Sequence, residues 1–231
     1  MNNARLKTLV IRFDNPITFQ ELTSFRGAII QAAGSGNVLF HNHVDNKFRY
    51  AYPLIQYKRI GGKAAIVCVG EGTEAIGDFF NNKDFNVVLG ERRMSLKIEN
   101  IKAENTLVQV WGENTFTYTM RKYLPLNQHN YKIYTHTESL MERTTILESC
   151  LVGNILSFAK GVGVFFEHNI TANILKIVNE SFYTYKGIQL MGMDVRFKSN
   201  VSLPNYIGLG KNASLGFGML MRDKEQYKEQ L

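Results

Sequence analysis

Two features are scarce in this sequence, cysteine and long apolar runs, and both bear on where the protein works. Cys68 and Cys150 are its only cysteines, both lie in apolar segments, and neither has a Cys-x-x-Cys partner. This pattern favours two buried thiols in a reducing cytosol, although the sequence is also compatible with a disulfide. The longest uncharged stretch near the middle, Ser149 to Ala159, is far shorter than the ~20 residues that a membrane span requires. Met1 to Arg5 lead into no apolar signal-peptide region, so we expect a cytoplasmic protein without a membrane partner.

The composition excludes intrinsic disorder, because 45% of the 231 residues are apolar and only 20% are charged. The length suits one large domain or two of about 100–150 residues each. Lys and Arg exceed Asp and Glu by 27 − 20 = 7, which favours a polyanionic partner, although a solvated surface without a partner can carry the same surplus. Cations interleaved with aromatic residues can neutralise phosphates and stack bases. Such clusters are Tyr57-Lys58-Arg59 with the nearby Lys63, Arg92-Arg93 before Met94, and Arg121-Lys122 between Tyr118 and Tyr123.

Hydrophobic periodicity and turn signals predict an α+β unit in the first half of the chain. Leu6 to Phe13 alternates like a strand, and Thr18 with Glu21 has the spacing of a capping box for a helix that is ended by Gly34-Ser35-Gly36. The order of the elements, β-α-β-β-α-β, is that of a ferredoxin-like split unit. The later elements are expected as strands at Leu54 to Lys58, Ala64 to Val69, Val87 to Leu89, Met94 to Ile98 and Leu107 to Val110, with a helix at Thr73 to Phe80.

A second set of elements follows Pro125. Glu138 to Lys160 carries an apolar stripe at helical spacing, and Gly161 ends the helix. We therefore expect two tandem ferredoxin-like, RRM-related units with antiparallel sheets, residues 1–125 and residues 126–231. The strands of the second unit are expected at Asn173 to Val178, Ile188 to Phe197 and Leu215 to Met221.

The clearest chemical signal is His41-Asn42-His43, in the loop after the first helix. In an extended segment the side chains at i and i+2 point the same way, about 6.6 Å apart. Two imidazoles at that separation can bracket one phosphate as general acid and general base, and Lys47 can stabilise the charge that develops there. A metal site built on His-x-His, or a loop with no chemical role, is compatible with the same spacing. Asp45 is near, but no matching set of ligands accompanies it, and we expect no metal and no cofactor.

A second signal is the run Gly208 to Gly218, which has four glycines in eleven residues and includes Lys211. Glycines leave backbone N–H groups accessible and permit positive φ, so the loop can approach a phosphate backbone closely. It is neither a Walker loop nor a dinucleotide fingerprint, because no Gly-Lys-Ser/Thr opens a helix and no strand-then-helix context follows. A tight β connection without anion binding is compatible with the same glycines.

The Gly-x-Gly and Gly-Phe-Gly arrangement just before the C-terminal strand resembles the hallmark of the CRISPR precursor-RNA-processing endoribonucleases. The block from Phe40 to Lys58 is also similar to members of that family, and the order of elements agrees over essentially the whole chain. The resemblance implies metal-independent cleavage within the CRISPR repeat RNA. In that reaction the ribose 2′-OH attacks the adjacent phosphate and leaves a 2′,3′-cyclic phosphate and a 5′-OH.

By the same resemblance His41 and His43 are the general acid and base, and Lys47 matches the lysine that some members use. Because other members use tyrosine, Tyr50 or Tyr52 is an alternative to one histidine. The implied partner is precursor CRISPR RNA, with effector-complex subunits or a second copy of the chain, as a homodimer, as further candidates. The alternative functions are a non-catalytic RRM-like RNA-binding subunit of a CRISPR effector complex and a metal-dependent phosphodiesterase. RNA contacts are expected at Lys58, Arg59, Lys63, Gly208, Gly210, Lys211, Gly216 and Gly218.

Overall fold

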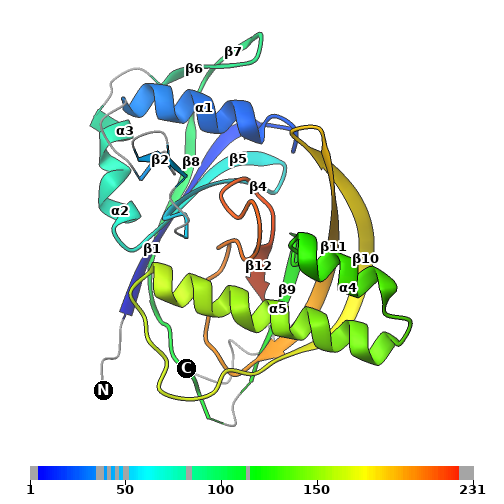
Figure 1. Ribbon diagram of the computed structural model, residues 1–231. Coiled ribbons are helices and arrows are strands. Elements are labelled where there is room, and N and C mark those ends of the chain that lie inside the picture. The colour runs from blue at the N-terminus through cyan, green and yellow to red at the C-terminus, as the bar shows by residue number, and fades with distance from the viewer. Residues whose placement is uncertain are drawn as a thin grey trace. The chain divides into compact units, whose positions relative to one another are not determined.

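The computed structural model describes residues 5–34, 39–40, 43–44, 47–48, 52–81, 85–112 and 115–223. The chain divides into two compact α+β units, whose elements are labelled in Figure 1. The N-terminal unit comprises Arg5–Thr106 together with Ser214–Gly216. The C-terminal unit comprises Leu107–Ala213 and the chain from Phe217 onward. No helix within the described ranges is both long and apolar enough to cross a membrane.

The N-terminal unit contains, in chain order, β1 (Arg5–Pro16), α1 (Leu22–Ala33), β2 (His43–Val44), β3 (Lys47–Phe48), β4 (Ile55–Ile60), β5 (Lys63–Val69), α2 (Gly72–Ala75), α3 (Gly77–Asn81), β6 (Asn86–Leu89), β7 (Arg92–Ser95) and β8 (Ile98–Leu107). Its main sheet has the strand order β4-β5-β1-β8, and β5 pairs antiparallel with both of its neighbours. Numbered within the sheet, the strands stand in the order 2-3-1-4, which is the ferredoxin-like arrangement expected from the sequence. Two short hairpins, β2–β3 and β6–β7, are added to this frame.

The predicted capping contacts precede helix α1, but the helix begins at Leu22, three residues later than Thr18 as N-cap would place it. The Thr18 N–H donates to the Glu21 carboxylate at 2.7 Å, and the Glu21 N–H donates to the Thr18 hydroxyl at 3.3 Å, which is a capping box. The helix ends at Gly34, whose φ of 82° is one that glycine adopts without strain. Phe25 and Ile29 are fully buried in the core of the unit. The local signal and the buried stripe agree, which is why this element was predictable.

The C-terminal unit contains β9 (Phe116–Tyr123), α4 (Gln128–His136), α5 (Leu140–Gly161), β10 (Ala172–Tyr185), β11 (Ile188–Ser199) and β12 (Met219–Arg222). Its sheet has the order β10-β11-β9-β12, which is again 2-3-1-4. The predicted long helix is present as α5, with Leu147, Leu151 and Ile155 fully buried. The tandem ferredoxin-like fold class is therefore confirmed.

Strand β9 and helix α4 were not predicted from the sequence. Tyr118 and Met120 of β9 are fully buried, and the strand pairs with β11 on one side and β12 on the other. Because both partners lie in the second half of the chain, β9 belongs to the C-terminal unit. The two units therefore divide between Thr106 and Leu107, which differs from the expected boundary after residue 125.

Candidate functional site

The predicted acid–base residues lie in a segment that the structure describes only in part. His41 lies outside the described residues. The backbones of His43 and Lys47 are described, and they belong to the β2–β3 hairpin, in which His43 pairs with Phe48 and Val44 with Lys47. The roles of these three side chains stay predictions.

Two residues that flank the hairpin in the sequence, Phe40 and Tyr52, have defined contacts. Phe40, the residue before His41, is 2% exposed and belongs to the hydrophobic core of the N-terminal unit. On the other side, the Tyr52 hydroxyl accepts a hydrogen bond from Nε2 of Gln56 at 2.8 Å. Gln56 is fully buried on β4 and also donates to the Pro53 carbonyl at 3.0 Å. Tyr52, one of the two tyrosines offered as an alternative to a histidine, is thus held by the sheet, whereas Tyr50 lies outside the described residues.

In the first basic cluster, Tyr57-Lys58-Arg59 with Lys63, one lysine is buried and the other contacts carboxylates of the protein. Lys58 is fully buried on β4, and burial lowers its pKa to about 7. This position differs from the expectation of a surface cation, because a buried side chain presents no charge to a surface ligand. Lys63 donates to the Asp14 carboxylate at 2.6 Å and to the Glu99 carboxylate at 2.7 Å, contacts that raise its pKa. Asp14 and Glu99 are 49 and 36 residues away from Lys63 in the sequence, so no local sequence pattern predicts these partners.

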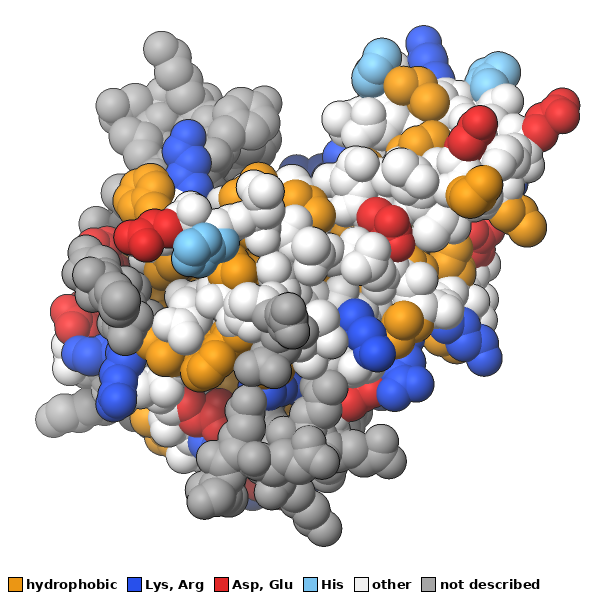
Figure 2. Space-filling view, turned by 90° about the horizontal axis from the view of Figure 1, so that it is seen from below, with side chains coloured by type: hydrophobic (Ala, Val, Ile, Leu, Met, Phe, Trp, Pro, Cys, Tyr) orange, Lys and Arg blue, Asp and Glu red, His pale blue; other side chains and the backbone are white. Residues whose placement is uncertain are grey.

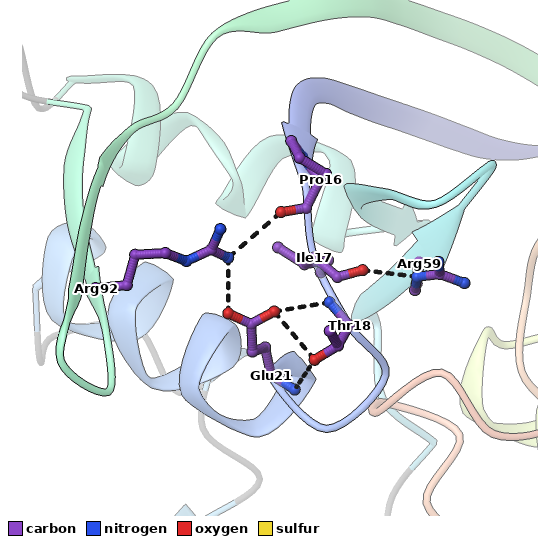
Figure 3. A network of polar contacts seen from close by, with 6 residues as sticks. All are labelled: Pro16, Ile17, Thr18, Glu21, Arg59 and Arg92. Atoms are coloured by element: carbon purple, nitrogen blue, oxygen red, sulfur yellow. Dashed lines mark hydrogen bonds and ion pairs between the residues drawn. The ribbon is translucent and has the colours of Figure 1, made fainter.

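Two arginine side chains, Arg59 and Arg92, donate hydrogen bonds to groups of the protein near the start of α1 (Figure 3). The exposed Arg59 donates from Nε to the Ile17 carbonyl at 2.6 Å. Arg92, at the start of β7, donates to the Glu21 carboxylate at 2.7 Å and to the Pro16 carbonyl at 3.3 Å. The Thr18 N–H, the Thr18 hydroxyl and Arg92 together lower the Glu21 pKa. The network fastens the β6–β7 hairpin to the capping box of α1.

The glycine loop, residues 208–218, is built on close backbone contacts. The Leu209 N–H donates to the Gly218 carbonyl at 3.0 Å, and the Gly218 N–H donates to the Lys122 carbonyl at 3.0 Å. Gly218 has φ of 61°, and a Cβ there would lie 1.8 Å from the Leu209 oxygen. Gly210 has φ of 85°, and a Cβ there would lie 2.8 Å from the Tyr123 ring. These two positions therefore require glycine for backbone packing, whether or not the loop binds an anion.

The middle of the glycine loop belongs to the N-terminal unit. The Tyr57 N–H of β4 donates to the Ser214 carbonyl at 2.8 Å, and Leu215 forms a parallel bridge with Tyr57. A Cβ on Gly216 would lie 2.6 Å from a methyl group of Leu22. The loop thus extends the edge of the sheet next to β4. These contacts are those of a tight β connection. The RNA contact predicted for the loop stays a prediction.

Lys211 differs from the other predicted RNA contacts. Its backbone N–H donates to the Leu124 carbonyl at 3.2 Å, and its side chain is exposed. Within the described part of the chain, its ammonium group has no ion pair. Figure 2 shows other Lys and Arg side chains at several separate places on one face, among hydrophobic and uncharged ones. A cation without a protein partner is the kind that can serve a bound phosphate.

The side chains that the structure describes contain no group of three or more His, Cys, Asp or Glu residues that could hold a metal ion. The side chains of His41 and His43 are not among the described ones. Both cysteines are free; Cys68 is buried as the sequence favours, Cys150 is only partly buried, and desolvation raises the pKa of each thiol. Neither thiol is therefore activated as a nucleophile.

Two ferredoxin-like units, with a glycine-rich loop packed into both, define a protein of the tandem ferredoxin-like class. Residues 4–107 match the family model of the Cas6b N-terminal domain, and residues 110–222 match that of the Cas6b C-terminal domain. The chain belongs to the Cas6b family. The resemblance stated from the glycine loop and the histidine block is thereby confirmed.

Individual relatives agree with this assignment. An uncharacterized protein of Methanocaldococcus jannaschii is 32% identical over 147 residues, which cover 60% of this chain and 98% of the relative. A crystal structure of Cas6b has a TM-score of 0.86 at 23% identity, over 95% of this chain and 100% of that one. A crystal structure described as a CRISPR RNA processing endoribonuclease, Cas6b, has a TM-score of 0.72 at 22% identity, over the same shares of the two chains. At these identities the structural matches show a common fold.

Proposed function

We propose that this protein is an endoribonuclease that binds CRISPR repeat RNA and cleaves it within the repeat. The observation that supports this most directly is that Cas6b domain models match both halves of the chain. One of the structural relatives is described as a CRISPR RNA processing endoribonuclease, and its fold covers 95% of this chain. The basic surplus of seven charges fits a polyanionic substrate.

The proposed reaction is internal transfer from the ribose 2′-OH. The 2′-oxygen forms a bond to the adjacent phosphorus as a base removes its proton, and the bond from phosphorus to the 5′-oxygen breaks as an acid protonates that oxygen. The products are a 2′,3′-cyclic phosphate and a 5′-OH. The nucleophile is already held beside the phosphate, so proximity supplies much of the rate enhancement, and a DNA substrate lacks it.

His41 and His43 are the residues we assign to acid and base, because an imidazole populates both protonation states near neutral pH. Lys47, which pairs with Val44 in the β2–β3 hairpin, is assigned to the charge that develops on the phosphorane. Tyr52 follows this segment in the sequence, and its hydroxyl is hydrogen-bonded to Gln56. The buried Phe40 gives the segment a fixed starting point.

The proposed RNA contacts are not equivalent. Lys211 offers an exposed cation without an ion pair among the described residues, and Arg59 is also exposed. Lys63 shares its charge with two carboxylates, and Lys58 is buried. We therefore assign the larger part of phosphate binding by the predicted residues to Lys211 and Arg59. Gly210, Gly216 and Gly218, all at positive φ, act by letting the backbone take this path.

The test is cleavage of labelled CRISPR repeat RNA in the presence of EDTA. The parental protein should give one shorter product that carries a 2′,3′-cyclic phosphate, and a single deoxyribose 5′ of the scissile phosphate should abolish that product. His41→Ala and His43→Ala should each slow cleavage by about 10²–10⁴-fold with RNA affinity largely kept. His168→Ala, at an exposed position with no assigned role, is the matched control and should cleave at the parental rate.

Three results would contradict the proposal in different ways. RNA that is bound but never cut would favour the non-catalytic subunit. Cleavage that is lost in EDTA and restored by Mn²⁺ or Zn²⁺ would favour a metal-dependent phosphodiesterase. Parental rates in both histidine variants would show that the acid and base lie elsewhere.

A further inference from the structure

An open pocket of about 550 Å³ lies within the C-terminal unit, between α4 and α5. Its walls come from α4 and the segment before it, from α5, and from Lys211 of the glycine loop. The volume lies within the range of about 300–1,000 Å³ that small-molecule sites usually have. Apart from Lys211, the function proposed above gives no role to the residues of this pocket.

The pocket has one charged lining residue, and it is positive. Lys211 is a lining residue, whereas no Asp or Glu is among the others. The Leu124 carbonyl holds the Lys211 backbone at 3.2 Å, and the positive φ of Gly210 sets the direction of the chain just before it. Partial burial lowers the Lys211 pKa, as expected for an ammonium group whose surroundings supply no counter-charge. The pocket therefore favours an anionic group near Lys211.

Two asparagine side chains give the pocket hydrogen-bonding groups. Asn130 donates its Nδ2 to the Cys150 thiol at 3.3 Å, and Asn154 donates its Nδ2 to the Tyr123 hydroxyl at 2.7 Å. These bonds orient both amides, and each Oδ1 remains as an acceptor. The exocyclic amino groups of nucleobases are donors of the kind such oxygens accept.

The rest of the wall includes apolar side chains, among them Ile133 of α4 and Ile146 of α5. A cation, two amide acceptors and an apolar surface together match a ligand with a phosphate, a polar edge and a flat hydrophobic body. We propose that this pocket binds one nucleotide, with its phosphate at Lys211 and its base between the two helices. The source is an unpaired nucleotide of the bound RNA or a free mononucleotide, and the first source rests on the proposed function.

Gly153 of α5 gives a way to close the pocket without disturbing the fold. It lines the pocket, and a Cβ built on it meets no heavy atom within 4 Å. Gly153→Leu should therefore fill the space, and Gly153→Ala is the matched control that leaves most of it open. Both variants replace glycine inside a helix, so both should melt at or above the parental temperature. Lys211→Ala is the second variant, and it removes the cation without filling the pocket.

The experiment measures fluorescence anisotropy of labelled ten-nucleotide RNAs of A, C and U with the full chain, and competition by AMP, CMP and UMP. Gly153→Leu should weaken oligonucleotide binding by about tenfold, and Gly153→Ala should change it by less than twofold. Competition by a mononucleotide that Gly153→Leu abolishes would also support the pocket, with a free nucleotide as its ligand. Equal affinity of all Gly153 variants for every probe would overturn the inference.

Cleavage of the repeat RNA is measured separately on the same proteins. If Gly153→Leu binds every probe like the parent and still cleaves, the pocket is overturned and the proposed function stands. If the parent never cleaves but Gly153→Leu loses nucleotide binding, the pocket is supported and the proposed function fails.

Discussion

The cations of the β4–β5 hairpin and the cation of the glycine loop look alike in sequence and differ in the folded protein. On the hairpin, Lys58 is buried and Lys63 contacts two carboxylates. Arg59, between them, donates to the Ile17 carbonyl. In the glycine loop, Lys211 is exposed and has no ion pair with a described residue. A basic residue can bind a phosphate only where the fold places no acidic side chain beside it and does not bury it.

The difference follows from what surrounds each segment. β5 lies in a sheet whose strands bring Asp14 of β1 and Glu99 of β8 to Lys63, so the charge of this lysine is neutralised by its own neighbours. The glycine loop is held by backbone hydrogen bonds that involve Leu124 and Leu209, and neither residue supplies a carboxylate. The same positive charge thus stabilises the fold in one region and remains free for a ligand in the other.

The largest effect is expected from breaking the loop that positions Lys211. Gly218→Ala places a Cβ at a positive φ and 1.8 Å from the Leu209 oxygen. We expect a loss of more than about 3 kcal/mol in the free energy of unfolding. Thermal melting checks this, with a fall in Tm of about 6 °C or more. Gly153→Ala is the matched control and should melt at or above the parental Tm; equal Tm values for all three proteins would contradict the close packing of the loop.

Burial of Lys58 should make the protein more stable as pH rises. Its folded pKa of about 7 is below the ordinary value of 10.5, so above pH 7 the unfolded chain binds more protons than the folded one. Stability should therefore increase between about pH 7 and pH 10.5, by on the order of 3 kcal/mol from this group. Urea unfolding at pH 7 and pH 9.5 measures it. Lys58→Met should be more stable than the parent at pH 7 and should lack this part of the pH dependence; identical pH profiles would show that Lys58 is solvated.

RNA affinity should separate the two regions directly. Lys211→Ala should weaken RNA binding by about threefold to tenfold and reduce the slope of log affinity against log salt by about one. Lys63→Ala should change both quantities less, because its charge already contacts Asp14 and Glu99. Anisotropy titrations at several salt concentrations measure both variants. An equal loss in both would show that RNA displaces the carboxylates from Lys63.

The smallest effect should come from freeing Lys63. Glu99→Gln removes one of its two counter-charges and also an ion-pair partner of Arg12. RNA affinity should rise by about twofold, while stability should change little, because ion pairs between solvent-exposed side chains contribute little to it. The same titrations test it, with Glu104→Gln as a control on a carboxylate that pairs with Lys102 instead. A fall in RNA affinity would contradict the view that carboxylates withhold Lys63 from phosphate.

Much of the fold was predictable where local and long-range signals agree. The Thr18–Glu21 capping box, the Gly34 terminator and the apolar stripe of α5 each appear as expected. The sequence does not predict β9, although Phe116 to Met120 alternate in the way of a strand, because its aromatic and basic residues also fit a surface cluster that contacts RNA. Tyr118 is in fact fully buried, and its hydroxyl donates to the Val201 carbonyl at 2.9 Å.

Motifs and periodicity are local properties of the chain, so they were enough to identify the family and the two α+β units, and they carry the prediction that His41 and His43 act as acid and base. Which of the predicted cations have a counter-charge follows only from the folded chain, since the partners of Lys63 are 36 and 49 residues away. The tertiary structure also decided that β9 joins the second sheet and that Lys211 lines a pocket between two helices. Burial and ion pairing depend on neighbours in space, and a linear pattern does not record which neighbours those are.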